Sequence, residues 1–201
     1  MRNLTLDAIF LFRHNLGMRR DRTTEMPRLS VVAALLVLMA AGLVGGCGAP
    51  GTPAETADAN VPPAPTQPPP WSLGSPENAV ISYLHWISLA YRVSNSEVAS
   101  QTFTPYEEVR VNSYVQYNIQ EGRAIDQVLT GLQVKSVQAS EGTATVAAHE
   151  EWRYRYISLK TKRYSSAEQT ASYESTYTVV KGEDGAWRVD KVQALSAGPV
   201  K

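Results

Sequence analysis

Glu150 and Cys47 are the two side chains of this sequence whose type and setting suggest chemistry. Glu150 lies between Ala148 and Trp152 in a segment where apolar and polar residues alternate, on the apolar side of the alternation. A carboxyl group among apolar side chains can donate or accept a proton during a reaction. Cys47 is the only cysteine of the 201 residues, so no disulfide partner exists for it in the chain. The first residue suggests acid–base chemistry, and the second suggests covalent modification.

Two simpler interpretations of Glu150 compete with a catalytic one. The carboxylate could pair with a cation, or a β-bulge could turn it outward. No Asp or His forms a recognisable dyad with it. The pocket candidates that would surround it are Trp152, Tyr154, Tyr173 and Tyr177, whose polar groups could supply hydrogen bonds. The structural interpretations are favoured over catalysis. Once an activity is known, unchanged turnover in a Glu150→Gln variant would exclude the acid–base role.

Cys47 ends a segment typical of protein export. Residues 29–46 carry no charge over 18 positions, and small residues stand just before the cysteine. The basic residues Arg19, Arg20, Arg22 and Arg28 lie shortly before this run. Residues 44–47 read Val-Gly-Gly-Cys and resemble a bacterial lipobox. The resemblance implies a lipoprotein whose signal peptide is removed before Cys47. It also implies a diacylglyceryl group, typically carrying palmitate, on that cysteine. Such an anchor would hold the protein firmly on the extracytoplasmic face of the cell membrane.

The leader leaves two alternatives open. An apolar run of about 18 residues is borderline for spanning a bilayer, so it could remain as an anchor. It could also be an ordinary signal peptide followed by a chance cysteine. Residues 1–46 are interpreted as the leader. A true start at Met18 would make residues 1–17 an artefact of the assigned start, and a true start at Met26 would make residues 1–25 one.

Residues 47–70 are predicted to form a disordered tether behind the lipidated cysteine. Eight of the 23 residues from 48 to 70 are proline, and the rest are mostly small or polar, so they offer little to bury. Fully extended at ~3.1 Å per residue, this tether would reach ~70 Å. The folded domain is predicted to span residues 71–201.

The first half of the domain is predicted to be helical. Ser75 can cap a helix that begins with Pro76, and apolar residues then recur at three- and four-residue spacing. Thr104 and Glu107 resemble a capping box for a second helix that ends near Gly122.

The second half of the domain is predicted to contain four antiparallel strands joined by hairpins. The candidates cover residues 128–139, 143–159, 169–181 and 186–195, and most of them alternate between apolar and polar residues. Helices followed by such strands indicate an α+β domain in which a curved sheet wraps the helices.

This order resembles the nuclear-transport-factor-2-like (NTF2-like) cone fold. The likeness rests on a first helix that starts Pro-Glu-Asn-Ala-Val at residue 76, and on the closing stretch Gly-Ala-Trp-Arg-Val-Asp-Lys-Val at residues 185–192. The domain is also similar to the intermembrane-space domain of plastid-division proteins and their bacterial relatives. The resemblance implies a pocket at the open end of the cone. It also implies that dimerisation through the outer sheet face would be compatible with the fold, although the sequence does not demand it.

Other chemistries find little support in the sequence. His14 lies in the leader, while His85 and His149 are expected at the surface, so neither a metal site nor a cofactor is predicted. Residues 71–201 hold 13 basic and 14 acidic residues, a balance that argues against nucleic-acid binding. The sequence therefore predicts a non-catalytic envelope domain that binds a protein partner or a small ligand. An isomerase- or dehydratase-type enzyme using Glu150 is the alternative.

Overall fold

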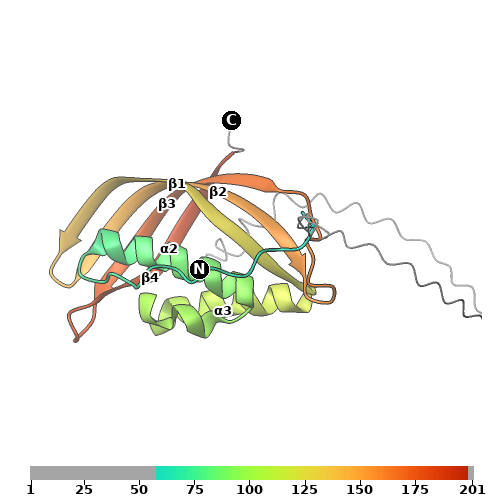
Figure 1. Cartoon of the computed structure of the whole chain (residues 1–201). Helices are drawn as coiled ribbons and strands as arrows, with labels where there is room; N and C mark the ends of the chain where they lie inside the picture. Colours follow the sequence, from blue (N-terminus) through green and yellow to red (C-terminus); the bar gives the residue numbers. More distant parts are fainter. Residues whose placement is uncertain (1–57, 199–201) are drawn as a thin grey trace, which may run out of the picture.

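The computed structural model describes residues 58–198, in which helices come first and a four-stranded sheet follows. The elements in chain order are α2 (Pro76–Val93), the 3-10 helix η1 (Ser96–Thr102), α3 (Pro105–Gln120), β1 (Arg123–Ser140), β2 (Thr143–Ser158), β3 (Gln169–Lys181) and β4 (Trp187–Gly198). The strands pair in sequence order, each antiparallel to the next. The sheet curves over α2 and α3 (Figure 1), which confirms the predicted α+β cone. Residues 1–57, including Cys47, and 199–201 lie outside the described part.

Helix α2 starts where the sequence predicts and packs under the curved sheet. The Ser75 side chain accepts a hydrogen bond from the backbone N–H of Asn78 at 3.3 Å, and Pro76 occupies the first turn. The helix ends at Ser94, whose φ of 57° is left-handed. Most of its apolar side chains are buried in the core, including Ala79, Val80, Tyr83, Leu84, Trp86, Ile87 and Ala90.

Helix α3 also starts at the predicted position, but the predicted capping box is wrong. The Thr104 hydroxyl makes no cap; it donates instead to the Asp190 carboxylate on β4 at 2.7 Å. Glu107 does not reach back to Thr104, because its side chain turns into the interior, where it is 1% exposed. Tertiary partners therefore replace the local hydrogen bonds that the spacing suggests.

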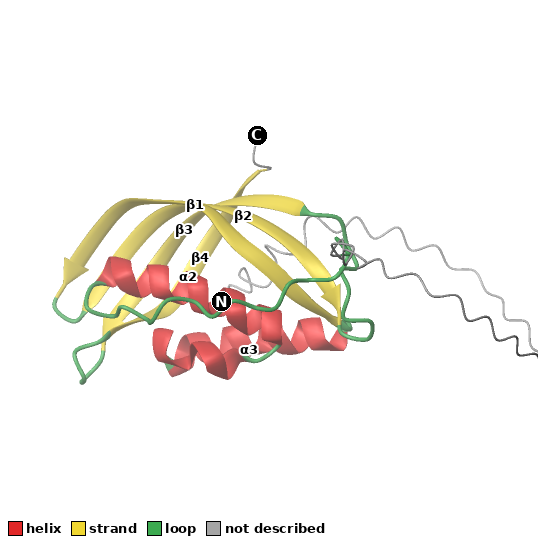
Figure 2. Ribbon diagram, viewed as in Figure 1, coloured by secondary structure: helices red, strands yellow, loops and turns green. Residues whose placement is uncertain are grey.

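Strand β2 follows the predicted alternation from Ala144 to Trp152. Along β2, Ala144, Val146, Ala148, Glu150 and Trp152 are all buried, and the residues between them are more exposed. Tight turns close the β1–β2 and β3–β4 hairpins, where Gly142 (φ 73°) and Gly185 (φ 79°) adopt left-handed backbone (Figure 2). Strand β1 begins earlier than predicted and is bulged between Leu129 and Gly131. The alternation of β2 is lost near its end, where Tyr154 and Tyr156 are half-buried and Ile157 is buried.

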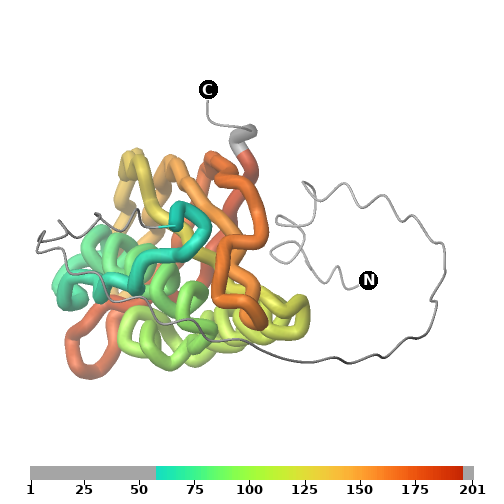
Figure 3. Tube along the Cα trace, turned by 45° about the vertical axis from the view of Figure 1, so that its right-hand side comes forward, coloured from blue at the N-terminus to red at the C-terminus, as the bar shows by residue number. Residues whose placement is uncertain are grey.

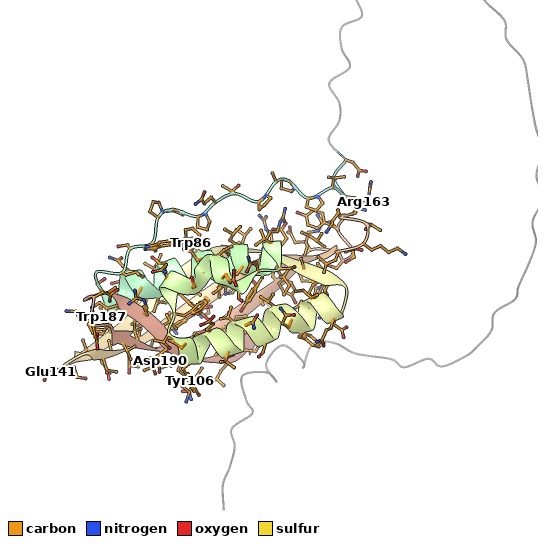
Figure 4. All side chains as sticks on the ribbon, turned by 90° about the horizontal axis from the view of Figure 1, so that it is seen from below. Trp86, Tyr106, Glu141, Arg163, Trp187 and Asp190 are labelled. Atoms are coloured by element: carbon orange, nitrogen blue, oxygen red, sulfur yellow. The ribbon has the colours of Figure 1, made fainter. Side chains whose placement is uncertain are left out.

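Residues 58–70, here called the strap, differ from the prediction of a free tether, because they lie along α2. The Trp86 indole N–H donates to the Pro69 carbonyl at 3.1 Å, and the Arg92 guanidinium donates to the Pro63 carbonyl. At its start the strap meets the β2–β3 loop, where the Tyr164 N–H donates to the Asn60 carbonyl at 3.0 Å (Figure 3). Figure 4 shows the strap passing along α2 between the regions labelled Arg163 and Trp86. Proline lacks an N–H but keeps its carbonyl acceptor, so this segment can satisfy donors on α2.

None of the helices within residues 58–198 has the length and apolar character needed to cross a membrane. The apolar run at residues 29–46 belongs to the part of the chain that the structure does not describe.

Candidate functional site

A cavity of about 110 Å³ lies between α2 and the inner face of the sheet. Helix α2 contributes one wall, β2 and β3 contribute the opposite wall, and β1, β4 and α3 each add side chains. Its aromatic lining consists of Tyr83, Tyr91, Trp152, Tyr154, Tyr173 and Tyr177. Its polar lining includes Arg110, Gln127, Glu150 and Ser175. The fold thus produces a small aromatic chamber with a few polar groups, the usual composition of a ligand site.

Glu150 faces this cavity and is held there by neutral donors. Its side chain is 4% exposed, and its Oε2 accepts a hydrogen bond from the Trp152 indole N–H at 2.9 Å. The Tyr177 hydroxyl donates to Oε1. No ion pair of Glu150 occurs within residues 58–198. Neither simpler interpretation of this residue holds, since it does not pair with a cation and does not turn outward.

The β-bulge considered for Glu150 lies in the neighbouring strand. The register of β1 against β2 shifts between Leu129 and Gly131, so Gly131 pairs with Glu151 and Leu132 pairs with Glu150. The extra residue stands in β1, while β2 pairs with β3 without a register shift. An ideal Cβ built on Gly131 would lie 2.9 Å from Glu151 Oε2, so the bulge brings the β1 backbone close to the outward carboxylate. Glu150 keeps its inward direction.

All four pocket candidates from the sequence line the same cavity as Glu150. Burial raises the pKa of Tyr177 well above its usual value, and the Glu150 carboxylate that accepts its hydrogen bond raises it further. Burial, with added repulsion from Tyr154 and Glu150, raises the pKa of Tyr173 to about 12. Both phenols therefore stay protonated at neutral pH and can act as hydrogen-bond donors.

A second buried cluster at the cavity, built around Glu107, went unpredicted. The Arg110 guanidinium donates to both carboxylate oxygens of Glu107, with Nε 2.9 Å from Oε2. The Tyr83 hydroxyl donates to Glu107 and accepts from Arg110 Nη2 at 2.9 Å. The available signal was the spacing of Glu107, Arg110 and Val111, which places all three on one face of the helix. The resemblance to a capping box pointed to a different role for Glu107.

An aromatic contact links the two buried carboxylates. The rings of Tyr83 and Tyr177 meet edge to face, with centroids 6.2 Å apart. Tyr83 hydrogen bonds to Glu107, and Tyr177 hydrogen bonds to Glu150. The Glu107 charge is offset by Arg110, whereas the Glu150 charge has no such partner in the described part of the chain. Counted with formal charges, Glu107, Arg110 and Glu150 together leave an excess of one negative charge beside the cavity.

The histidines take no part in this site. His85 is exposed on α2, and His149 points from the outer face of β2, where its Nδ1 lies 2.9 Å from Glu174 Oε1. Within residues 58–198 no three His, Cys, Asp or Glu side chains are grouped so that they could hold a metal ion. Cys47 and His14 lie outside the described residues.

Solved structures include chains with a similar fold. The intermembrane space region of the chloroplast protein ARC6 is 21% identical, with a TM-score of 0.54; the match covers 64% of this chain and 100% of that chain. A ketosteroid isomerase-like protein from Erwinia carotovora atroseptica is 18% identical, with a TM-score of 0.43, and the match covers 63% and 97% of the two chains. A periplasmic fragment of TraM is 16% identical, with a TM-score of 0.42 and coverage of 64% and 100%.

The similarity to ARC6 confirms the predicted resemblance to the plastid-division domain at the level of the fold. At 21% identity it assigns neither an activity nor a partner. No protein-family model matches this chain, and no curated protein matches it. The function must therefore be argued from the cavity and its side chains.

Proposed function

We propose that this protein is a lipid-anchored domain that binds a small ligand in its cone, outside the cytoplasmic membrane, without catalysing a reaction. The observation that carries the proposal is the cavity of about 110 Å³ in which Glu150 is buried among aromatic side chains. A buried carboxylate costs stability unless it is well satisfied, and a packed apolar core would not need one. Its retention at a cavity wall is best explained by a ligand that uses it.

The bonds of Glu150 favour binding over acid–base catalysis. Each of its oxygens already accepts one hydrogen bond, from Trp152 and from Tyr177. These two bonds hold the carboxylate at a fixed position, and a bound ligand can use the lone pairs that remain on its oxygens. Arg110, the other charged group at the cavity, is committed to Glu107. The arrangement suits a fixed recognition group better than an acid–base pair.

The size of the cavity favours a small-molecule ligand over a protein partner. An apolar cavity of about 150 Å³ is large enough to take up benzene. A cavity of about 110 Å³ would therefore admit a molecule somewhat smaller than that. Binding of a protein partner at the outer sheet face would not use Glu150 at all, and so leaves the site unexplained.

The anchoring part of the proposal rests on Cys47 and its sequence context. The strap begins at Asp58, so ten residues separate Cys47 from the first residue of the described part. Even fully extended at ~3.1 Å per residue, they would span ~31 Å, less than half the reach expected for a free tether. The proposed anchor would therefore hold the domain near the bilayer surface.

Replacing Cys47 with serine is expected to leave the chain without lipid and uncut, so that it migrates as the longer precursor, because serine cannot form the thioether that carries the lipid. In the parent protein, mass spectrometry of detergent-extracted material should show a chain that begins at Cys47 and carries a lipid. A chain that begins upstream of Cys47, or an unmodified Cys47, would contradict the anchoring proposal and leave the cavity proposal standing.

Replacing Ala171 with leucine is expected to abolish small-molecule binding, because Ala171 lines the cavity and the added atoms would fill it. Ligand-observed NMR with a library of small polar molecules would measure this on the detergent-solubilised full chain. Ala147→Leu is the matched control, since Ala147 lies on the opposite face of β2. Binding that is absent from the parent, or equal in both variants, would overturn the cavity proposal.

A further inference from the structure

Charge, aromatic lining and hydrogen-bond acceptors at the cavity are consistent with one class of ligand. We infer that the cavity selects a small organic cation, an alkylammonium ion, through Glu150 and the surrounding aromatic rings. This inference rests on the proposed function, because it names the ligand of the same site.

The negative charge of Glu150 at the cavity wall is not offset by a protein cation, and a bound cation would offset it. Arg110 and Glu150 are the two charged residues that line the cavity. Arg110 is held in an ion pair with Glu107, a residue that is 1% exposed, so its charge is offset. Glu150 receives hydrogen bonds from neutral groups only. An ammonium ion would supply the opposite charge next to a carboxylate that is 4% exposed, where the attraction is stronger than in bulk water.

The aromatic lining offers a second form of attraction for a cation. A ring face attracts a cation within about 6 Å of its centroid, most strongly in a desolvated site. The cation–π contacts within residues 58–198 involve Tyr117, Tyr156, Tyr164 and Trp187, none of which lines the cavity. No protein cation contacts the rings of Trp152 or Tyr177 in that part of the chain, and both residues line the cavity.

Ser175 supplies an additional acceptor. It is 3% exposed and lines the cavity beside Tyr177. Its hydroxyl lies near enough to the Tyr177 phenol to lower the pKa of that group, but it has no hydrogen bond of standard geometry in the described chain. A buried hydroxyl without such a bond costs free energy. An ammonium N–H could donate to Ser175 and Glu150 from within the cavity.

Matched pairs of cationic and neutral molecules test the inference on the parent protein. Ethylammonium is compared with ethanol, and methylammonium with methanol, by NMR titration of the full chain in nonionic detergent at constant ionic strength. The Trp152 indole N–H, which is bonded to Glu150, is the reporter. Each cation is expected to bind at least about tenfold more tightly than its neutral counterpart.

Two variants then test whether the preference for cations depends on Glu150. Glu150→Gln keeps the size of the side chain and is expected to remove the preference for cations. Glu174→Gln, on the outer face with 44% of its side chain exposed, is the matched control and should keep it. Neutral molecules that bind as tightly as the cations would overturn this inference while supporting the ligand-binding function. Failure of every probe, cationic and neutral, to bind the parent would overturn both. The comparison of probes on the parent does not depend on either variant folding.

Discussion

Replacing Arg110 with leucine is expected to lower the free energy of unfolding by about 3 kcal/mol. Glu107 is 1% exposed, and Arg110 is the cation that neutralises it. Removing the cation would leave a buried carboxylate with the Tyr83 hydroxyl as its remaining side-chain partner. Unpairing a buried charge typically costs about 3–5 kcal/mol. We expect the lower end because 34% of the Arg110 side chain is exposed, so water can partly replace it. Urea denaturation at neutral pH measures the change.

An exposed ion pair gives the control for this prediction. Lys135 and Glu174 lie on the outer face of the sheet, with 45% and 44% of their side chains exposed. Lys135→Leu should cost less than about 1 kcal/mol, because exposed pairs contribute little. The double variant Glu107→Leu/Arg110→Leu should recover part of the loss, since it removes the buried charge together with its partner. An Arg110→Leu variant as stable as Lys135→Leu would contradict the buried-pair interpretation.

The sequence predicted the sheet well because alternation reports burial directly. Along β2 the predicted inward row is the buried row from Ala144 to Trp152, and the residues proposed for a pocket all line one cavity. Side chains alternate between the two faces of a strand, so assigning one residue to a face also assigns its neighbours. The direction of Glu150 follows from the same rule, since the bulge that could have reversed it lies in β1.

Features that depend on distant contacts were not predictable. The hydroxyl of Thr104 bonds to Asp190, 86 positions away, and no local pattern signals that partner. The strap reads as a tether because its proline content excludes a core. Its docking depends on donors at Trp86 and Arg92, which become apparent only once α2 is placed. The volume of the cavity depends on sheet curvature and packing, which alternation does not encode.

Raising the pH above about 10 is expected to destabilise the protein steeply, because protonated phenols are buried in the core. Tyr83 and Tyr177 are each 1% exposed. Burial raises the pKa of both well above the ordinary value, and a neighbouring carboxylate, Glu107 or Glu150, raises each further. Burial also raises the pKa of Tyr91 and Tyr173 to about 12. The folded protein therefore keeps protons that the unfolded chain releases.

The sign of the effect follows from this difference in bound protons. Below pH ~10 the phenols are protonated in both states, and their contribution to stability is complete. Above that pH the unfolded chain loses protons first, so stability falls until the folded-state pKa is reached. Each protected phenol contributes a slope of about 1.4 kcal/mol per pH unit, so Tyr83 and Tyr177 together give about 2.7 kcal/mol per pH unit.

Urea denaturation from pH 9 to pH 12 would measure this slope, with tyrosinate absorbance as a second probe. The double variant Tyr83→Phe/Tyr177→Phe should start less stable, because Glu107 and Glu150 each lose a donor, yet its stability should fall less steeply with pH. Tyr106→Phe, at a position 66% exposed on α3, is the matched control and should follow the parent. A double variant as pH-sensitive as the parent would mean that neither phenol is protected. That result would also contradict the hydrogen bond from Tyr177 to Glu150, which we take to hold the carboxylate in place inside the cone.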